Sequence, residues 1–438
     1  MLIAWNWALC ILTSVALLTT FVKCRAVFLK PSAAFLVFFH IRVQWAGTML
    51  AGTTEMYLPE PIYFIALLHG VPLAALAVTC TAGRRTLWRV WMKVVRSEIQ
   101  VERRSLVVLL ALAGAVTLYY LANVPFGETG LYTIFADPLR SSQARAESLK
   151  LLDNPWLQYA FTFLRNSLGP FIAVIATELL ISGLHERRLL HSATAAAMLG
   201  FIFVAVSLPG ERAPAAYLLL AIILSRFLMR GLRGSILGLA GGALAVLSIP
   251  ALLTISREDL AISLDVYGQY LLVMANRAFV EPAETAMWYV HYAQTTGLFG
   301  LGAIPKLAWF FDLGPVDAAN IIGLQYALNP LESVSEGTSF IFSYFSYFGA
   351  VSMLISLVCL LLLDTVVVVY DGLSERMLIP LVTSLILTSS TLVEADYTTV
   401  LLSNGFVVSI VLALILDRLP RVVFAPGTPL SVGGSRAG

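Results

Sequence analysis

Two arginines in this sequence stand where helix energetics alone do not explain them, and the first is Arg212. It lies in the turn at 208–214, immediately before an apolar helix. A positive charge at a helix N-terminus opposes the helix macrodipole, so the helix gains nothing from Arg212. A bound anion would account for this arginine, but so would a side chain that reaches lipid headgroups or pairs with Glu211. The sequence leaves both interpretations open.

The second arginine, Arg277, begins a row of polar and aromatic side chains. At successive intervals of 4, 3, 4 and 3 residues it is followed by Glu281, Glu284, Trp288 and His291. This spacing places them on one face of a helix, in which Pro282 predicts a kink or a break. Arg277 and Glu281 would form a surface ion pair worth under about 1 kcal/mol. Alternatively, Arg277 binds an anion while a carboxylate or His291 accepts a proton from a hydroxyl nucleophile.

Further side chains are candidates for substrate binding. Aromatic rings cluster beside the row, among them Trp288, Tyr289 and Tyr292. Such rings form belts at membrane interfaces, and they also stack on sugar rings. Glu336 precedes an apolar helix, whose positive end a carboxylate stabilises. Arg165 lies near one end of an apolar helix, where it is costly unless paired or hydrated, and we expect it to face the same cavity as Arg212.

The elements that carry these residues are membrane helices. The chain has 438 residues, of which 59% are hydrophobic and 12% are charged, about half the charged fraction of soluble domains. Apolar runs near the length that crosses a bilayer as a helix recur along it. The sequence therefore predicts an all-α polytopic integral membrane protein with about eleven transmembrane helices (10–12). We place them at 2–22, 33–53, 62–82, 106–122, 157–181, 192–208, 215–231, 235–253, 339–363, 377–393 and 398–416.

The distribution of charge predicts which connectors share a side. Lysines and arginines concentrate in alternate connectors, which the positive-inside rule assigns to the cytoplasm. The other connectors, including the long polar segment, then share the outer face. The chain divides into N-terminal helices with short loops at 1–253, a long extracytoplasmic loop with short amphipathic helices at 254–337, C-terminal helices at 338–418 and a disordered cytoplasmic tail at 419–438.

Several classes of function lack their sequence patterns. The chain has no glycine-rich phosphate loop of an ATP-driven pump and no clustered cysteines and histidines of a zinc site. The long polar segment carries no paired acidic motif of a metal-dependent glycosyltransferase. No lysine or arginine tract resembles a nucleic-acid-binding arm. We therefore expect no metal, no cofactor and no nucleic-acid partner, and we expect the lipid bilayer as the surroundings.

Three segments together resemble a known family. They are SLPGERAPAAYLLLAIILS around Arg212, ANRAFVEPAETAMWYV around Arg277 and EGTSFIFSYFSYFGAVSMLI after the long loop. The plan of many helices, one late outer loop and two such arginines is similar to that of the Wzy-type polymerases of O-antigen and oligosaccharide repeat units. These polymerases are related to the O-antigen ligases.

This resemblance implies a metal-independent glycosyltransferase of the bacterial cytoplasmic (inner) membrane, with its active site facing the periplasm. Its substrate would be an oligosaccharide repeat unit on undecaprenyl pyrophosphate. A hydroxyl of one unit would attack the anomeric carbon of the growing glycan, and the lipid pyrophosphate would leave. Arg212 and Arg277 would stabilise the pyrophosphate. The base would be Glu281, Glu284 or His291, and the partners would include a chain-length regulator and a flippase of the same pathway.

Two alternatives to a polymerase stay open from the sequence. A ligase would transfer the finished glycan with the same donor chemistry. A transporter or flippase would line its helices with charged residues. That alternative rests on four residues inside apolar segments: His40, Arg42, Arg165 and Glu178.

Overall fold

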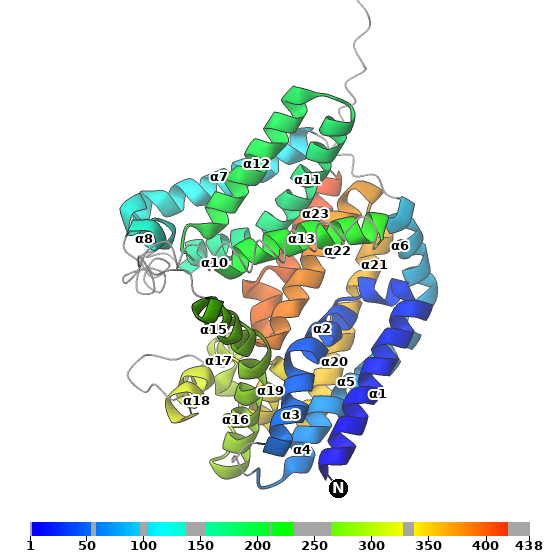
Figure 1. Cartoon of the computed structure of the whole chain (residues 1–438), viewed down its shortest axis with the longest axis vertical. Coiled ribbons are helices and arrows are strands. Elements are labelled where there is room, and N and C mark those ends of the chain that lie inside the picture. Colours follow the sequence, from blue (N-terminus) through cyan, green and yellow to red (C-terminus); the bar gives the residue numbers. More distant parts are fainter. Residues whose placement is uncertain are drawn as a thin grey trace, which may run out of the picture.

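The computed structural model describes residues 2–53, 58–96, 103–136, 155–210, 212–231, 264–326 and 337–418 (Figure 1). Every regular element within these ranges is a helix. Nine helical stretches among them are long and apolar enough to cross a membrane. The predicted all-α, multi-pass membrane protein is therefore confirmed.

The spans follow one another in the predicted order, and several are built from two or three helical pieces. They comprise α1 (Leu2–Lys23), α2 (Pro31–Phe39) with α3 (Trp45–Thr53), α4 (Pro61–Ile65) with α5 (Val71–Thr81), α7 (Arg103–Asn123), α10 (Pro155–Phe163) with α11 (Gly169–His185), α12 (Leu189–Ser207), α19 (Phe340–Phe348) with α20 (Ser352–Asp364) and α21 (Val366–Gly372), α22 (Glu375–Ser390) and α23 (Phe406–Arg418).

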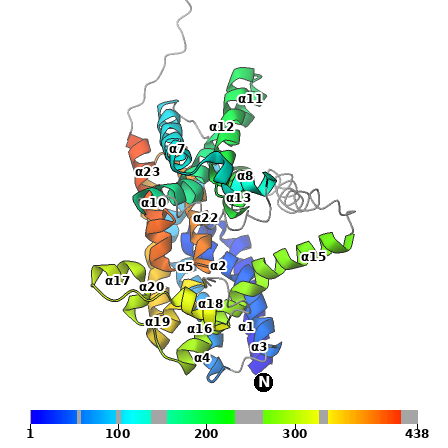
Figure 2. The same cartoon turned by 90° about the vertical axis from the view of Figure 1, so that its left-hand side faces the viewer.

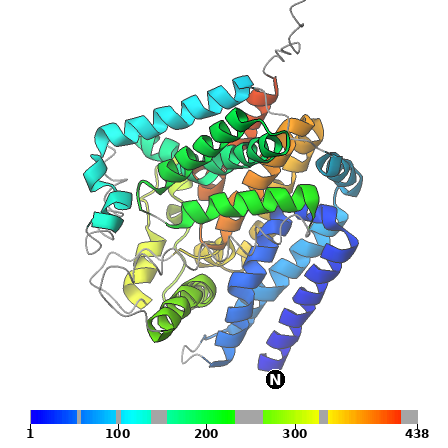
Figure 3. The same ribbon diagram turned by 45° about the horizontal axis from the view of Figure 1, so that its top comes forward.

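Two of the expected spans do not appear among these nine. The one expected at 215–231 forms helix α13 (Arg212–Arg230), which carries Arg226 and Arg230 in its second half and is not among the nine apolar stretches. Figures 1 and 3 show α13 crossing the molecule between the α7, α11 and α12 group and the N-terminal helices. The span expected at 235–253 lies outside the described residues.

Helix α22 forms the centre of the bundle. All of its residues from Met377 to Ser390 are buried, although Pro380 lies inside it. It packs against α2, α11, α13 and α23, so helices from both halves of the chain meet on it. Burial of apolar side chains on every face is typical of a helix enclosed by others rather than by solvent.

Turns of π-helix interrupt the helices at five places among the described residues. They are η2 (His40–Gln44), η3 (Ala66–Gly70), η5 (Leu164–Leu168), η6 (Asn276–Val280) and η10 (Thr399–Ser403). Such turns shift the side chains that follow around the helix axis and are frequent at functional sites. Four of the five carry a histidine or arginine, namely His40 and Arg42, His69, Arg165, and Arg277.

The described part of the long loop, 264–326, is a series of short helices. α15 (Leu264–Ala275) runs through η6 into α16 (Glu281–Thr295), and α17 (Pro305–Phe310) and α18 (Ala318–Tyr326) follow. Pro282 stands in the first turn of α16, so the predicted break is present and lies just before that proline. α16 packs against α3, α4, α18 and α19, whereas α15 projects from the bundle (Figure 2).

Candidate functional site

An ion pair between Arg42 and Glu394, called here the open pair, joins three distant segments. Arg42 lies in η2, midway along the second span, and its guanidinium pairs with the carboxylate of Glu394. Its Nε also donates a hydrogen bond of 3.0 Å to the Ala278 carbonyl in η6. Glu394 belongs to the connector between the last two spans. One arginine therefore holds the second span, the long loop and the C-terminal helices together.

The predicted site arginine Arg277 is the neighbour of Ala278 in η6. Its Nε lies 3.7 Å from a Glu281 carboxylate oxygen, and the two side chains are 70% and 36% exposed. An exposed pair at this separation is worth under about 1 kcal/mol, so it holds Arg277 only weakly. Arg42 binds the carbonyl of the adjacent residue, so it contacts the same turn that carries Arg277.

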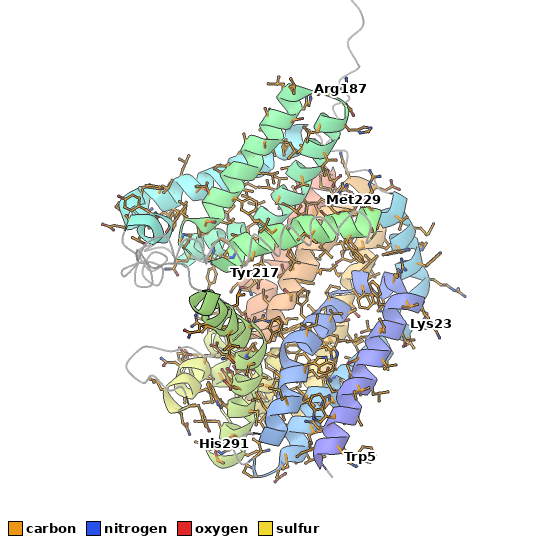
Figure 4. All side chains as sticks on the ribbon, in the orientation of Figure 1. Trp5, Lys23, Arg187, Tyr217, Met229 and His291 are labelled. Carbon is orange, nitrogen blue, oxygen red and sulfur yellow. The ribbon has the colours of Figure 1, made fainter. Side chains whose placement is uncertain are left out.

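Helix α13 brings the second predicted segment toward the same place. The described helix begins at Arg212, whose side chain lies outside the described set. Tyr217 (labelled in Figure 4) lies close enough to Arg42 and Glu394 to interact electrostatically with both. A helix rises about 1.5 Å per residue, so the backbone of Arg212 lies about 8 Å along the axis from Tyr217. The turn before Arg212 is fixed by Gly130, where any side chain would collide with the Pro209 carbonyl.

Asp396 is a functional candidate that the sequence analysis missed. It lies two residues after Glu394 and accepts hydrogen bonds from the Ser343 hydroxyl at 3.0 Å and the Tyr347 hydroxyl at 3.3 Å. Burial raises the pKa of Asp396 to about 6, although the bonds from Ser343 and Tyr347 oppose the shift. The sequence did hold a signal for this site. Two acidic residues lie close together in a short connector, and a serine and a tyrosine four residues apart share one face of a helix.

Gly337 shows how closely the end of the long loop approaches this connector. A Cβ at Gly337 would collide with the carbonyl oxygen of Glu394. The next residues, Thr338 and Ser339, are buried and lead directly into α19. The helix that presents Ser343 and Tyr347 to Asp396 is thereby positioned by a residue that only glycine fits.

The rest of the predicted row forms a separate group. His291 Nδ1 is hydrogen-bonded to the Tyr326 hydroxyl at 2.7 Å, and the Trp288 ring stacks on the same tyrosine with centroids 6.0 Å apart. The fifteen residues from Arg277 to His291 span about 20 Å of helix. The predicted row is therefore too long for one site, and His291 lies at the far end of α16 (Figure 4).

The remaining predicted residues are distributed along α16 and elsewhere. Tyr289 is buried, and Tyr292 stacks on Phe299 with centroids 4.5 Å apart. Burial raises the pKa of Glu284, and the negative charge of Glu281 raises it further. Arg165 lies in η5, where it is buried and interacts electrostatically with Tyr120. Glu336 lies outside the described residues.

The deep histidine belongs to a buried polar network that joins the first three spans. His40 is hydrogen-bonded to Ser14 at 2.9 Å and to Gln44 at 2.6 Å. Gln44 continues to His69, which in turn meets Asn6 at 2.6 Å. Polar groups inside an apolar bundle are costly unless they are satisfied. In this network the polar side chains are hydrogen-bonded to one another, which fits a role in helix packing.

A second arginine–glutamate pair, called here the closed pair, joins α11 to α13. The Arg226 guanidinium lies 2.7 Å from a Glu178 carboxylate oxygen.

Among the described residues, no three His, Cys, Asp or Glu side chains lie close enough together to hold a metal ion. No family model, no curated protein and no solved structure matches the chain.

Proposed function

We propose that this chain polymerises undecaprenyl-pyrophosphate-linked oligosaccharide repeat units into a surface polysaccharide at the outer face of a bacterial cytoplasmic membrane. The observation that carries the proposal is that Arg42 joins Glu394 to the turn that carries Arg277, with Tyr217 of α13 close to both members of the pair. These residues, with Glu281 and Asp396, are called here the arginine site. The long loop forms part of it, and the charge distribution in the sequence predicts that this loop faces the periplasm.

The arginines suit the leaving group of this reaction. A departing lipid pyrophosphate concentrates negative charge, and guanidinium groups offer planar, paired and permanently charged donors for it. Donors held in place before the reaction stabilise the charge that develops in the transition state. Arg42 is positioned by the Ala278 carbonyl, while Arg277 is held only by an exposed carboxylate. A pyrophosphate would replace carboxylates as the partner of both arginines.

The acceptor hydroxyl also needs a base. Its proton would move to a carboxylate while its oxygen forms the new bond to the anomeric carbon. The bond from that carbon to the pyrophosphate would break, and its electron pair would leave with the pyrophosphate. Asp396 suits the role because its pKa of about 6 leaves it ionised at neutral pH and still basic. Glu281 and Glu284 remain candidates, whereas the backbone of His291 lies about 20 Å along the helix axis from that of Arg277.

The test is a gel of lipid-linked and surface glycans from cells that carry Arg277→Ala at normal protein level. We expect single repeat units to accumulate and long chains to disappear. Arg188→Ala is the matched control, because Arg188 forms an exposed ion pair of 2.9 Å with Glu186 away from the site. Its glycans should equal those of the wild type.

The other outcomes of this gel separate the alternatives. Unchanged long chains in Arg277→Ala would overturn the proposal and reduce Arg277 to a surface ion pair. Long chains that persist on the lipid carrier would indicate a ligase. Loss of all outer-face glycan, with lipid-linked units trapped inside the cell, would indicate a flippase.

A further inference from the structure

Helix α6 (Arg84–Arg96) follows the third span directly and is not among the nine described stretches that are long and apolar enough to cross a membrane. Leu87, Val90 and Val94 recur at helical spacing and are fully buried. Their face packs against the 3-10 turn η1 (Arg25–Leu29), α13, α21 and α22. The opposite face is basic and exposed. Figures 1 and 3 show α6 at the edge of the bundle, so that face points away from the protein.

Polar contacts fix α6 on α21. Arg89 pairs with Asp371 at 3.0 Å, and Lys93 Nζ donates hydrogen bonds to the carbonyl oxygens of Asp371 at 2.5 Å and Leu373 at 3.3 Å. At the other end of the helix, Arg84 Nε donates to the Cys80 carbonyl at 2.7 Å. The helix is therefore docked through its own anchoring contacts before any ligand binds.

An open hollow of about 500 Å³ lies on the exposed face of α6. It is lined by four exposed residues: Arg84, Arg85, Trp88 and Arg89. Asp371 neutralises one of the three positive charges. Arg84 and Arg85 stand in the first helical turn, where the macrodipole disfavours positive charge. An anion in the hollow would relieve both the dipole and the mutual repulsion of the arginines.

We infer that this hollow binds the phosphate headgroup of an anionic phospholipid. Helix α6 begins at Arg84, three residues after the span ends at Thr81, which places the hollow at the depth of the headgroups. Trp88 is exposed beside the arginines, and tryptophan is enriched at that depth. Clustered basic side chains at a membrane surface attract anionic lipids. The site is independent of the proposed function, because it shares no residue with the arginine site.

The full-length chain in detergent, mixed with phosphatidylglycerol or phosphatidylcholine and measured by native mass spectrometry, tests this inference. The wild type should retain phosphatidylglycerol preferentially. Arg84→Ala/Arg85→Ala should lower that affinity by about 30-fold, the effect of two lost cations at an anionic surface. The control Arg187→Ala/Arg188→Ala removes the same charge from another exposed loop and should keep the preference.

A single variant distinguishes loss of lipid binding from misfolding. Arg85 is exposed and takes no part in the anchoring contacts described above, so Arg85→Gln should leave the chain folded and lower the affinity about fivefold. Equal losses in the site and control variants would overturn the inference. So would wild-type protein that binds both lipids alike. Inorganic phosphate that binds as well as phosphatidylglycerol and displaces it would assign the hollow to a free anion instead.

Discussion

Two arginine–glutamate pairs lie among the apolar helices, and they differ in how open they are. The closed pair, Arg226 with Glu178, has side chains that are 18% and 14% exposed. The open pair, Arg42 with Glu394, has side chains that are 22% and 46% exposed and also reaches the Ala278 carbonyl. Helix α13 is common to both, because it carries Arg226 and places Tyr217 beside the open pair.

This difference separates a packing role from a chemical one. A charged side chain in apolar surroundings is tolerated when it pairs with an opposite charge, and both pairs meet that condition. Only the open pair keeps a carboxylate that a substrate can reach and replace. The deep charged residues that favoured a transporter therefore divide into two kinds. His40 and Glu178 belong to closed contacts, and Arg42 belongs to an open one.

The largest effect is expected from breaking the closed pair. Arg226→Met should lower the free energy of unfolding by about 3–5 kcal/mol, because it leaves Glu178 charged and unpaired. Thermal unfolding in detergent measures the loss. The double variant Arg226→Met/Glu178→Leu should recover most of it, since no uncompensated charge remains. A single variant as stable as the double one would refute a structural role for the pair.

A smaller effect, on rate rather than stability, is expected from pH. If Asp396 is the base, glycan polymerisation should fall about tenfold between pH 7 and pH 5, because its pKa is about 6. Stability should move the other way. The folded chain holds the Asp396 proton more tightly than the unfolded chain, whose pKa is near 3.8, so the group stabilises the fold as pH falls from 6 toward 4.

Rate measurements across pH, paired with unfolding curves at each pH, check this prediction. The Asp396→Asn variant serves as the control and should be slow and insensitive to pH over the same range. A wild-type rate that stays flat from pH 7 to pH 5 would exclude Asp396 and return the role of base to Glu281 or Glu284.

The smallest effect concerns the aromatic group at the far end of α16. Tyr326→Phe removes the hydroxyl bonded to His291, which should lower stability by about 0.5–1.5 kcal/mol and leave glycan length unchanged. Chemical unfolding and the glycan gel measure the two quantities. Shortened glycans at full stability would bring His291 back into the reacting site.

Hydropathy and charge predicted the helical membrane fold because the length of each apolar segment can be read directly from consecutive residues. The break before Pro282 was likewise predicted, from the missing N–H of that proline, whereas the row from Arg277 to His291 stays a prediction from spacing. The extent of the site was not predictable in this way. Helical periodicity places side chains on one face but says nothing about which part of a long face meets another segment.

The pairing of Arg42 with Glu394 could not be predicted from the sequence for a different reason. Arg42 and Glu394 are 352 residues apart, and no local pattern links them. The π turns are also invisible to a periodicity of 3.6 residues, although η2 and η6 aim Arg42 and Ala278 at each other. Asp396 became a candidate only when α19 placed Ser343 and Tyr347 beside it.

The most direct test supplies purified chain with lipid-linked repeat units extracted from cells that lack it, in the presence of EDTA. Released undecaprenyl pyrophosphate and glycan length are measured together. We predict polymer from the wild type, and rates about 10²–10³-fold lower for Arg42→Lys and for Arg277→Lys, since lysine loses the paired donors. Arg188→Lys should match the wild type. Full activity in both site variants, or no polymer from the wild type, would contradict the arginine site as the place where pyrophosphate leaves.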